Sequence, residues 1–184
     1  VLPQTARRIA KHAIEADEPN RAVDPILSVL QERSRVEGKQ VHTPLLELLS
    51  TAIERSDLRA NDPRRAQALL DLGLHDLFMS GSSERAAHMC ERAKQIAEGA
   101  GDTATHAEAL RCLAKIKNRK VEFEASISNC RRALTLLEQV DEPIQQGLTR
   151  RTMSFALRRT DQVAEAEEQL TQAVDELEGF PIAR

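Results

Sequence analysis

The sequence predicts an all-α fold, a right-handed α-solenoid of antiparallel helix pairs. The 184-residue chain takes its apolar content mainly from Ala and Leu, with four Phe, no Tyr and no Trp. That composition favours helices over strands. Its seven Pro and seven Gly are few and stand at intervals. A helix pattern also recurs at an interval of 40 residues, and a period of this size is the signature of a helical repeat array.

The repeat is clearest in three stretches, which read HMCERAKQIAEGAGD, SNCRRALTLLEQVDE and EQLTQAVDELEGFPI. Each helix carries a small residue, then a small or apolar residue four positions later, then an alanine three positions after that. These offsets place the three residues on one helix face. The aligned sets are Ala86–Cys90–Ala93, Ser126–Cys130–Ala133 and Ala166–Leu170–Ala173. We expect these second helices of each pair at about 82–99, 121–139 and 161–178.

A first helix precedes each of these, at about 63–79, 104–118 and 143–159. The turns within the pairs read SGSS, NRK and RTD, and the loops between units contain GAGD, DEP and GFP. The predicted units therefore span about 63–102, 103–142 and 143–180, within a repeat region at 61–184. A helical bundle whose Ala-rich helices merely look alike is the alternative.

Residues 1–60 fit the repeat less well, and we expect a degenerate repeat or a cap there. The expected helices lie at about 3–16, 24–36 and 44–58. The segments VDP at Val23 and HTP at His42 suggest helix starts, because Asp or Thr before a first-turn Pro is a favoured N-terminus.

The units resemble the tetratricopeptide repeat (TPR). Ala114 and Ser154 match the small site of the first helix, Gly81 matches the turn glycine, and Phe123 and Val163 stand where a turn aromatic is usual. The repeat is longer than the family's usual period of about 34 residues, and a Lys occupies an aromatic site. The long variety is similar to repeats in bacterial signalling proteins, including regulatory parts of transcription activators and diguanylate cyclases.

Composition excludes several classes of protein. The net charge of −3 gives little nonspecific attraction to nucleic acid. No apolar run is long enough for a membrane span, and no signal peptide is visible. Three Cys without a close pair favour reduced thiols, and hence a cytoplasmic protein. The chain starts at Val1 rather than Met, so we expect it to be part of something longer.

Sequence motifs give no support for catalysis, a cofactor or a metal. The chain contains no G-x-S-x-G, no phosphate-binding glycine loop and no C-x2-C or H-x3-H spacing. His88 and Cys90 are two residues apart, which on a helix does not direct both at one ion. We therefore expect a non-enzymatic protein with no cofactor.

The TPR resemblance also implies a concave groove lined by the first helices, and here that groove would be basic. The implied groove positions are His75 and Phe78, with Asp71, in the first clear unit, Arg111, Lys115 and Asn118 in the second, and Arg151, Phe155 and Arg158 in the third. Arg pairs with carboxylates and Phe takes an apolar anchor, so we expect an acidic, partly apolar protein or peptide partner. A merely solvated basic face is the alternative.

Competing functions follow from the same pattern. One is a regulatory or sensory arm of a larger bacterial signalling protein, such as a diguanylate cyclase or a transcription regulator. Another is a self-association scaffold, a homodimer through Leu170, Val174 and Leu177 of the last helix, whose apolar stripe has no following helix to cover it. Nucleic-acid binding ranks last, because no Tyr or Trp is present for base stacking.

Overall fold

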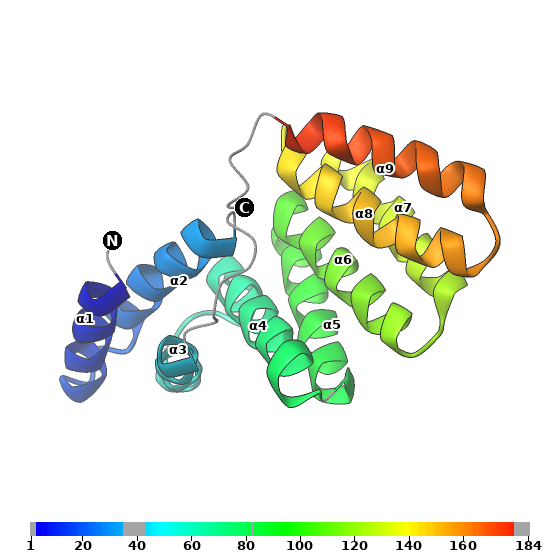
Figure 1. Ribbon diagram of the computed structural model, residues 1–184. Helices are drawn as coiled ribbons and strands as arrows, with labels where there is room; N and C mark the ends of the chain where they lie inside the picture. Colours follow the sequence, from blue (N-terminus) through cyan, green and yellow to red (C-terminus); the bar gives the residue numbers. More distant parts are fainter. Residues whose placement is uncertain (1–2, 35–42, 82, 179–184) are drawn as a thin grey trace.

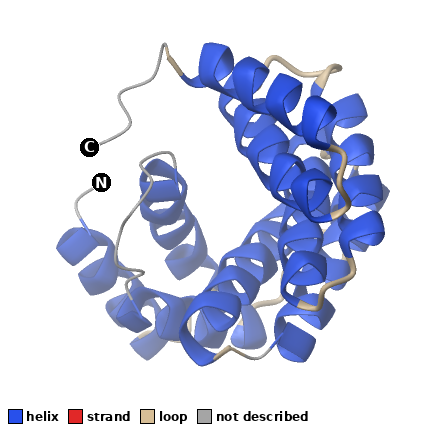
Figure 2. Cartoon of the chain, turned by 45° about the vertical axis from the view of Figure 1, so that its right-hand side comes forward, coloured by secondary structure: helices blue, strands red, loops and turns tan. Residues whose placement is uncertain are grey.

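The computed structural model describes residues 3–34, 43–81 and 83–178, and within these ranges every regular element is helical (Figure 2). The elements are α1 (Pro3–Glu15), α2 (Asn20–Ser34), α3 (Thr43–Arg55), α4 (Pro63–His75), a π-helical turn η1 (Asp76–Ser80), α5 (Ser83–Ala100), α6 (Thr103–Arg119), α7 (Phe123–Leu137), α8 (Pro143–Arg159) and α9 (Val163–Leu177). The predicted all-α class is confirmed.

The second half of the chain is a stack of antiparallel helix pairs, α4/α5, α6/α7 and α8/α9 (Figure 1). The first helices α4, α6 and α8 contact one another along the array, whereas in the described part the second helices make no comparable contacts. The array therefore curves toward its first helices, and Figure 2 shows the helices following an arc. This confirms the predicted solenoid of helix pairs, while the division into units at 103 and 143 stays a prediction.

Local signals start several helices where expected. Asp62 is the N-cap of α4, its side chain accepts a hydrogen bond from the Arg64 backbone N–H, and Pro63 opens the helix. Asp102 caps α6 by accepting from the Thr105 N–H at 3.1 Å. Most predicted ends agree with the observed ones within two residues. Val121 and Asp161 have positive φ and lie in the turns before α7 and α9.

Two N-terminal predictions were wrong. The second helix begins at Asn20 rather than 24, and Pro25 lies inside it. Ala22 and Val23 are fully buried, so extending the helix backward places both in the core. The third helix ends at Arg55 rather than 58. The end of the expected 24–36 helix, and the GFP loop from 179, lie outside the described residues.

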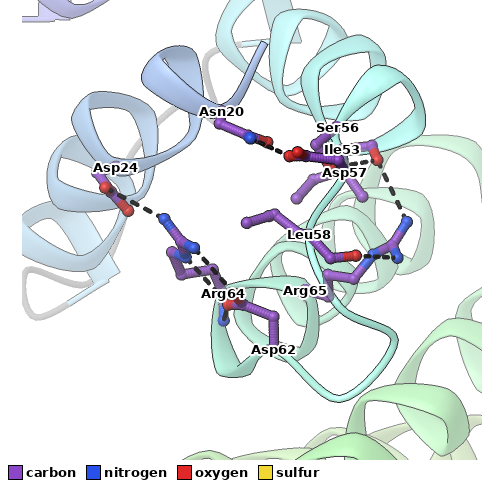
Figure 3. A network of polar contacts seen from close by, with 9 residues as sticks. All are labelled: Asn20, Asp24, Ile53, Ser56, Asp57, Leu58, Asp62, Arg64 and Arg65. Atoms are coloured by element: carbon purple, nitrogen blue, oxygen red, sulfur yellow. Dashed lines mark hydrogen bonds and ion pairs between the residues drawn. The ribbon is translucent and has the colours of Figure 1, made fainter.

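The third helix ends early because of a contact distant in sequence. The Arg65 guanidinium donates to the Ile53 carbonyl at 3.3 Å and to the Leu58 carbonyl at 3.0 Å, and the Ser56 hydroxyl also donates to Ile53 O (Figure 3). Side chains on α4 and in the α3–α4 connection thus satisfy carbonyls that a longer helix would have used internally. Neighbouring polar contacts, Asn20 to Asp57 and Arg64 to Asp24, tie α2 to the same region.

The small residues of the repeat pack where the helices approach closely. The buried members are Ala86, Cys90, Ala93, Ser126, Cys130, Ala133, Ala166 and Ala173, and Leu170 is partly buried. The N-terminal helices form their own apolar cluster, which also contains Leu58 of the α3–α4 connection and Ala68 of α4. That shared cluster and the polar network of Figure 3 attach the first three helices to the array.

Candidate functional site

The predicted groove residues of α6 and α8 lie on adjacent helices. The Asn118 side-chain amide donates to the Thr152 carbonyl at 3.2 Å, which joins the end of α6 to α8. Arg151, Phe155 and Arg158 are exposed on α8, and Lys115 and Asn118 are half-buried on α6. The structure therefore brings the second-unit and third-unit rows together near the carboxyl ends of these helices.

Phe78 lies in η1 and exposes 55% of its surface. The Lys115 ammonium is 5.9 Å from its ring centroid, and the Arg119 guanidinium carbon is 5.5 Å away. Arg119 also donates to the Leu77 carbonyl, which fixes the guanidinium beside the ring. We call Phe78, Lys115 and Arg119 the Phe78 cluster. It presents an apolar ring and two cations on one surface.

Phe155 forms a second arrangement of the same kind, and 47% of it is exposed. Its ring meets Phe123 of α7 edge to face, with centroids 6.4 Å apart and planes at 63°. The Arg159 guanidinium carbon is 5.4 Å from the Phe155 centroid. We call Phe123, Phe155 and Arg159 the Phe155 cluster.

Arg111 occupies a different environment from the other predicted groove residues. It is 5% exposed, and it pairs with Glu108 one helical turn earlier, at 3.1 Å. Burial, and then the nearby Glu108 carboxylate, raise the pKa of Asp71 on α4 well above its usual range, while a hydrogen bond from Gln67 opposes the shift. The Glu108 carboxylate thus compensates the charge of Arg111 within the chain.

His75 also lies among paired charges. Its Nδ1 is 3.7 Å from an Asp76 oxygen, and Arg85 of α5 contacts the other Asp76 oxygen at 2.9 Å. His75 and Arg111 therefore both have acidic neighbours within the chain.

Sequence reasoning missed Arg119, Arg159 and the pairing of Phe123 with Phe155. The signal was available for the two arginines. Arg119 follows Lys115 by four residues and Arg159 follows Phe155 by four residues, and side chains at that offset are neighbours on a helix. The Phe123–Phe155 contact joins two helices and carries no local signal.

The cysteines are core residues. Cys90 of α5 and Cys112 of α6 are buried. Burial raises the pKa of Cys130 to about 12. A buried thiol of high pKa is a poor nucleophile. Among the described residues no group of three or more His, Cys, Asp or Glu is placed to hold a metal ion.

A hollow of about 490 Å³ lies at the other end of the molecule, where α1 turns into α2 beside the end of α3. Its lining is charged, but Arg55 pairs with Asp17 at 2.6 Å, Arg21 pairs with Glu18, and Asn20 donates to Asp57. These pairs use most of the charged groups of the lining, although the Asn20 side-chain oxygen has no hydrogen-bond partner, so the hollow has the character of a polar joint between helices.

The stacked antiparallel pairs define a helical-repeat protein with a TPR-like fold. Two similar solved structures both contain the nearly identical TPR-like repeats of a kinesin-light-chain-like protein of Podosopora anserina, and one of the two carries a single substitution. The TM-scores are 0.58 and 0.57, the identities 13% and 14%, and each alignment covers 94% of this chain and 93% of the other. At this identity the likeness establishes the fold.

No family model matches the sequence. No curated protein matches it either. Within the described residues, none of the helices combines the length and apolar character that crossing a membrane requires.

Proposed function

We propose that this chain is a non-catalytic protein-interaction module that binds an acidic, partly apolar segment of another protein. TPR-like solenoids offer extended concave surfaces for protein partners. The observation that carries the proposal is the exposed row Arg151, Phe155 and Arg158 on α8, beside Lys115 on α6. Cations next to an exposed ring fit a partner with carboxylates and an apolar side chain.

Arg111 is buried and pairs with Glu108, so it is not part of the exposed row. We propose further that the module is the regulatory or sensory region of a larger bacterial signalling protein, such as a diguanylate cyclase or a transcription regulator, and that it acts in the cytoplasm. The long repeat supports that context.

Fluorescence anisotropy with a labelled Glu-rich peptide containing two Phe tests the proposal. Binding should weaken as salt rises, because screening reduces attraction between exposed charges. The double variant Arg151→Glu/Arg158→Glu should abolish it. The matched control is Arg92→Glu/Arg132→Glu, which reverses two exposed arginines on the second helices α5 and α7 and should leave binding unchanged. Equal loss in both variants would refute a site on the first helices.

Self-association is a second candidate, and one observation favours it: Val174 on the outer face of α9 is 54% exposed. The other two residues of the predicted dimer contact are partly covered within the chain, and Leu177 lies against Gly147 of α8. Sedimentation at micromolar concentration tests this candidate. A concentration-dependent dimer that Val174→Glu dissociates would support it, and a monomer at all concentrations would exclude it.

A further inference from the structure

The exposed apolar side chains gather at one edge of the array. Among the described residues, four of the exposed large apolar side chains lie close to the turns that join first to second helices, at most about one helical turn away. The other two, Ile9 and Val174, lie elsewhere. The four are Phe78, Val121, Phe155 and Val163. We call this the turn edge.

The turn edge is also where exposed cations accompany the rings. Arg119 and Arg159 each hold a guanidinium carbon close to a Phe ring, at 5.5 and 5.4 Å from the centroids. The ion pairs of the described residues do not include Arg119, Arg158 or Arg159. A guanidinium that stacks on a ring keeps N–H donors in its own plane for a carboxylate. Each cluster can therefore contact an apolar side chain and an adjacent acid together.

We infer that the turn edge is the docking site for the acidic segment, which anchors one apolar side chain on Phe78 and another on Phe155. The inference rests on the proposed function and specifies the partner: a peptide with two apolar residues, each next to Asp or Glu. The occupant follows from charge complementarity with Lys115, Arg119 and Arg159. Asn118 and Thr152, already hydrogen-bonded to each other, lie between the α6 and α8 rows.

An internal role for the rings is the competing explanation. Cation–π contacts at exposed sites contribute about 0.5–1 kcal/mol, and Phe155 also packs on Phe123. That role predicts a loss of stability when a ring is removed, with no dependence on the composition of a peptide. Binding and melting measurements on the same variants separate the two roles.

The experiment uses three labelled peptides of equal length: the Glu-rich peptide with two Phe, the same peptide with both Phe replaced by Ala, and the same peptide with every Glu replaced by Gln. Anisotropy is measured for the wild type, Phe78→Ala, Phe155→Ala, Arg119→Gln, Arg159→Gln and the control Val174→Ala. Val174 is matched in exposure, at 54%, but lies on α9 away from the turn edge.

We expect each Phe→Ala variant to bind the first peptide about tenfold more weakly or worse, as for a buried aromatic anchor. The same variants should bind the Ala peptide no worse than the wild type does, because the contact they remove is already missing. Val174→Ala should match the wild type. If Phe155→Ala lowers the melting temperature, Phe78→Ala and the two Arg→Gln variants carry the test.

Salt-dependent binding that neither Phe variant changes overturns the inference and leaves the proposed function standing. Equal binding of the Phe and Ala peptides by the wild type overturns the inference and leaves only the acidic part of the proposed function. Failure of all three peptides to bind overturns both. If the wild type sediments as a dimer that the Phe variants dissociate, and binds none of the peptides, the occupant of the turn edge is a second copy of the chain and the inference is wrong.

Discussion

Gly147 marks the closest approach of α8 and α9, and replacing it by Ala should destabilise the end of the array. A Cβ at this position would lie 2.8 Å from Leu177 Cγ and 3.2 Å from the Ala173 carbonyl oxygen. Real Cβ atoms do not approach other atoms as closely as 2.8 Å, so α9 must move outward or Leu177 must leave its position. Gly99, near the end of α5, has no atom within 4 Å of an added Cβ and provides the matched control.

The magnitude follows from two opposing terms. Ala is more favourable than Gly in a helix by about 1 kcal/mol, and both substitutions receive some of this gain. Inserting a methyl group into a filled contact costs about 1–3 kcal/mol, and this applies to Gly147 alone of the two positions. Gly99→Ala should therefore be neutral to stabilising, and Gly147→Ala should be less stable than it by about 1–3 kcal/mol.

Thermal denaturation followed by circular dichroism measures the difference. At about 2–4 °C per kcal/mol for a chain of this size, the two variants should differ by roughly 2–12 °C in melting temperature. Hydrogen exchange should localise the effect, with faster exchange of α9 amides in Gly147→Ala. If Gly147→Ala melts as high as Gly99→Ala and protects α9 equally, the close packing of α8 against α9 is refuted.

Three further outcomes are expected from denaturation experiments. Asp71→Asn should raise the melting temperature at pH 7. Burial and Glu108 raise the folded-state pKa of Asp71. The stability that the protonated carboxyl contributes is therefore full below about pH 4 and is lost as pH rises through the folded pKa. A lower melting temperature would contradict this. His106 is buried, and burial lowers its pKa, so stability should fall as pH drops below about 6.5, and His106→Gln should melt with a smaller pH dependence there. Arg65→Ala should cost about 1–3 kcal/mol in urea titrations, because it removes the donor to two backbone carbonyls at the end of α3 and after it. An unchanged midpoint would show that water replaces the guanidinium.

The repeat was predictable because close helix packing leaves a local trace. Positions such as Ala93 and Ala133 must be small where helices approach, and the offset of 40 residues repeats that requirement. The ends of the second and third helices were not predictable in the same way. Pro25 suggested a start, but burial of Ala22 and Val23 extends the helix past it, and the end of α3 depends on an arginine in α4.

The groove residues show the same limit. Offsets of four and three predict that Arg111, Lys115 and Asn118 share one side of α6, but they cannot show which of the three is buried. Arg111 is 5% exposed and pairs with Glu108 of the same helix, while Lys115, one turn later, is only half-buried. A single-helix pattern assigns residues to a face, whereas the burial of Arg111 depends on the helices that pack against α6.

The basic residues at the turn edge have a second explanation, which determines the experiment that decides their function. Arg119 and Arg159 lie in the last turns of α6 and α8, where cations stabilise the helix dipole by about 0.3–1 kcal/mol each. The dipole accounts for the arginines without any partner, so loss of binding on charge reversal must be compared with the melting temperature of the same variant. The dipole does not account for Phe78 and Phe155, whose rings remain about half exposed beside those cations. An exposed aromatic ring gains free energy when another apolar group covers it, and the Phe substitutions therefore discriminate between a docking site and a helix end stabilised by its own charges.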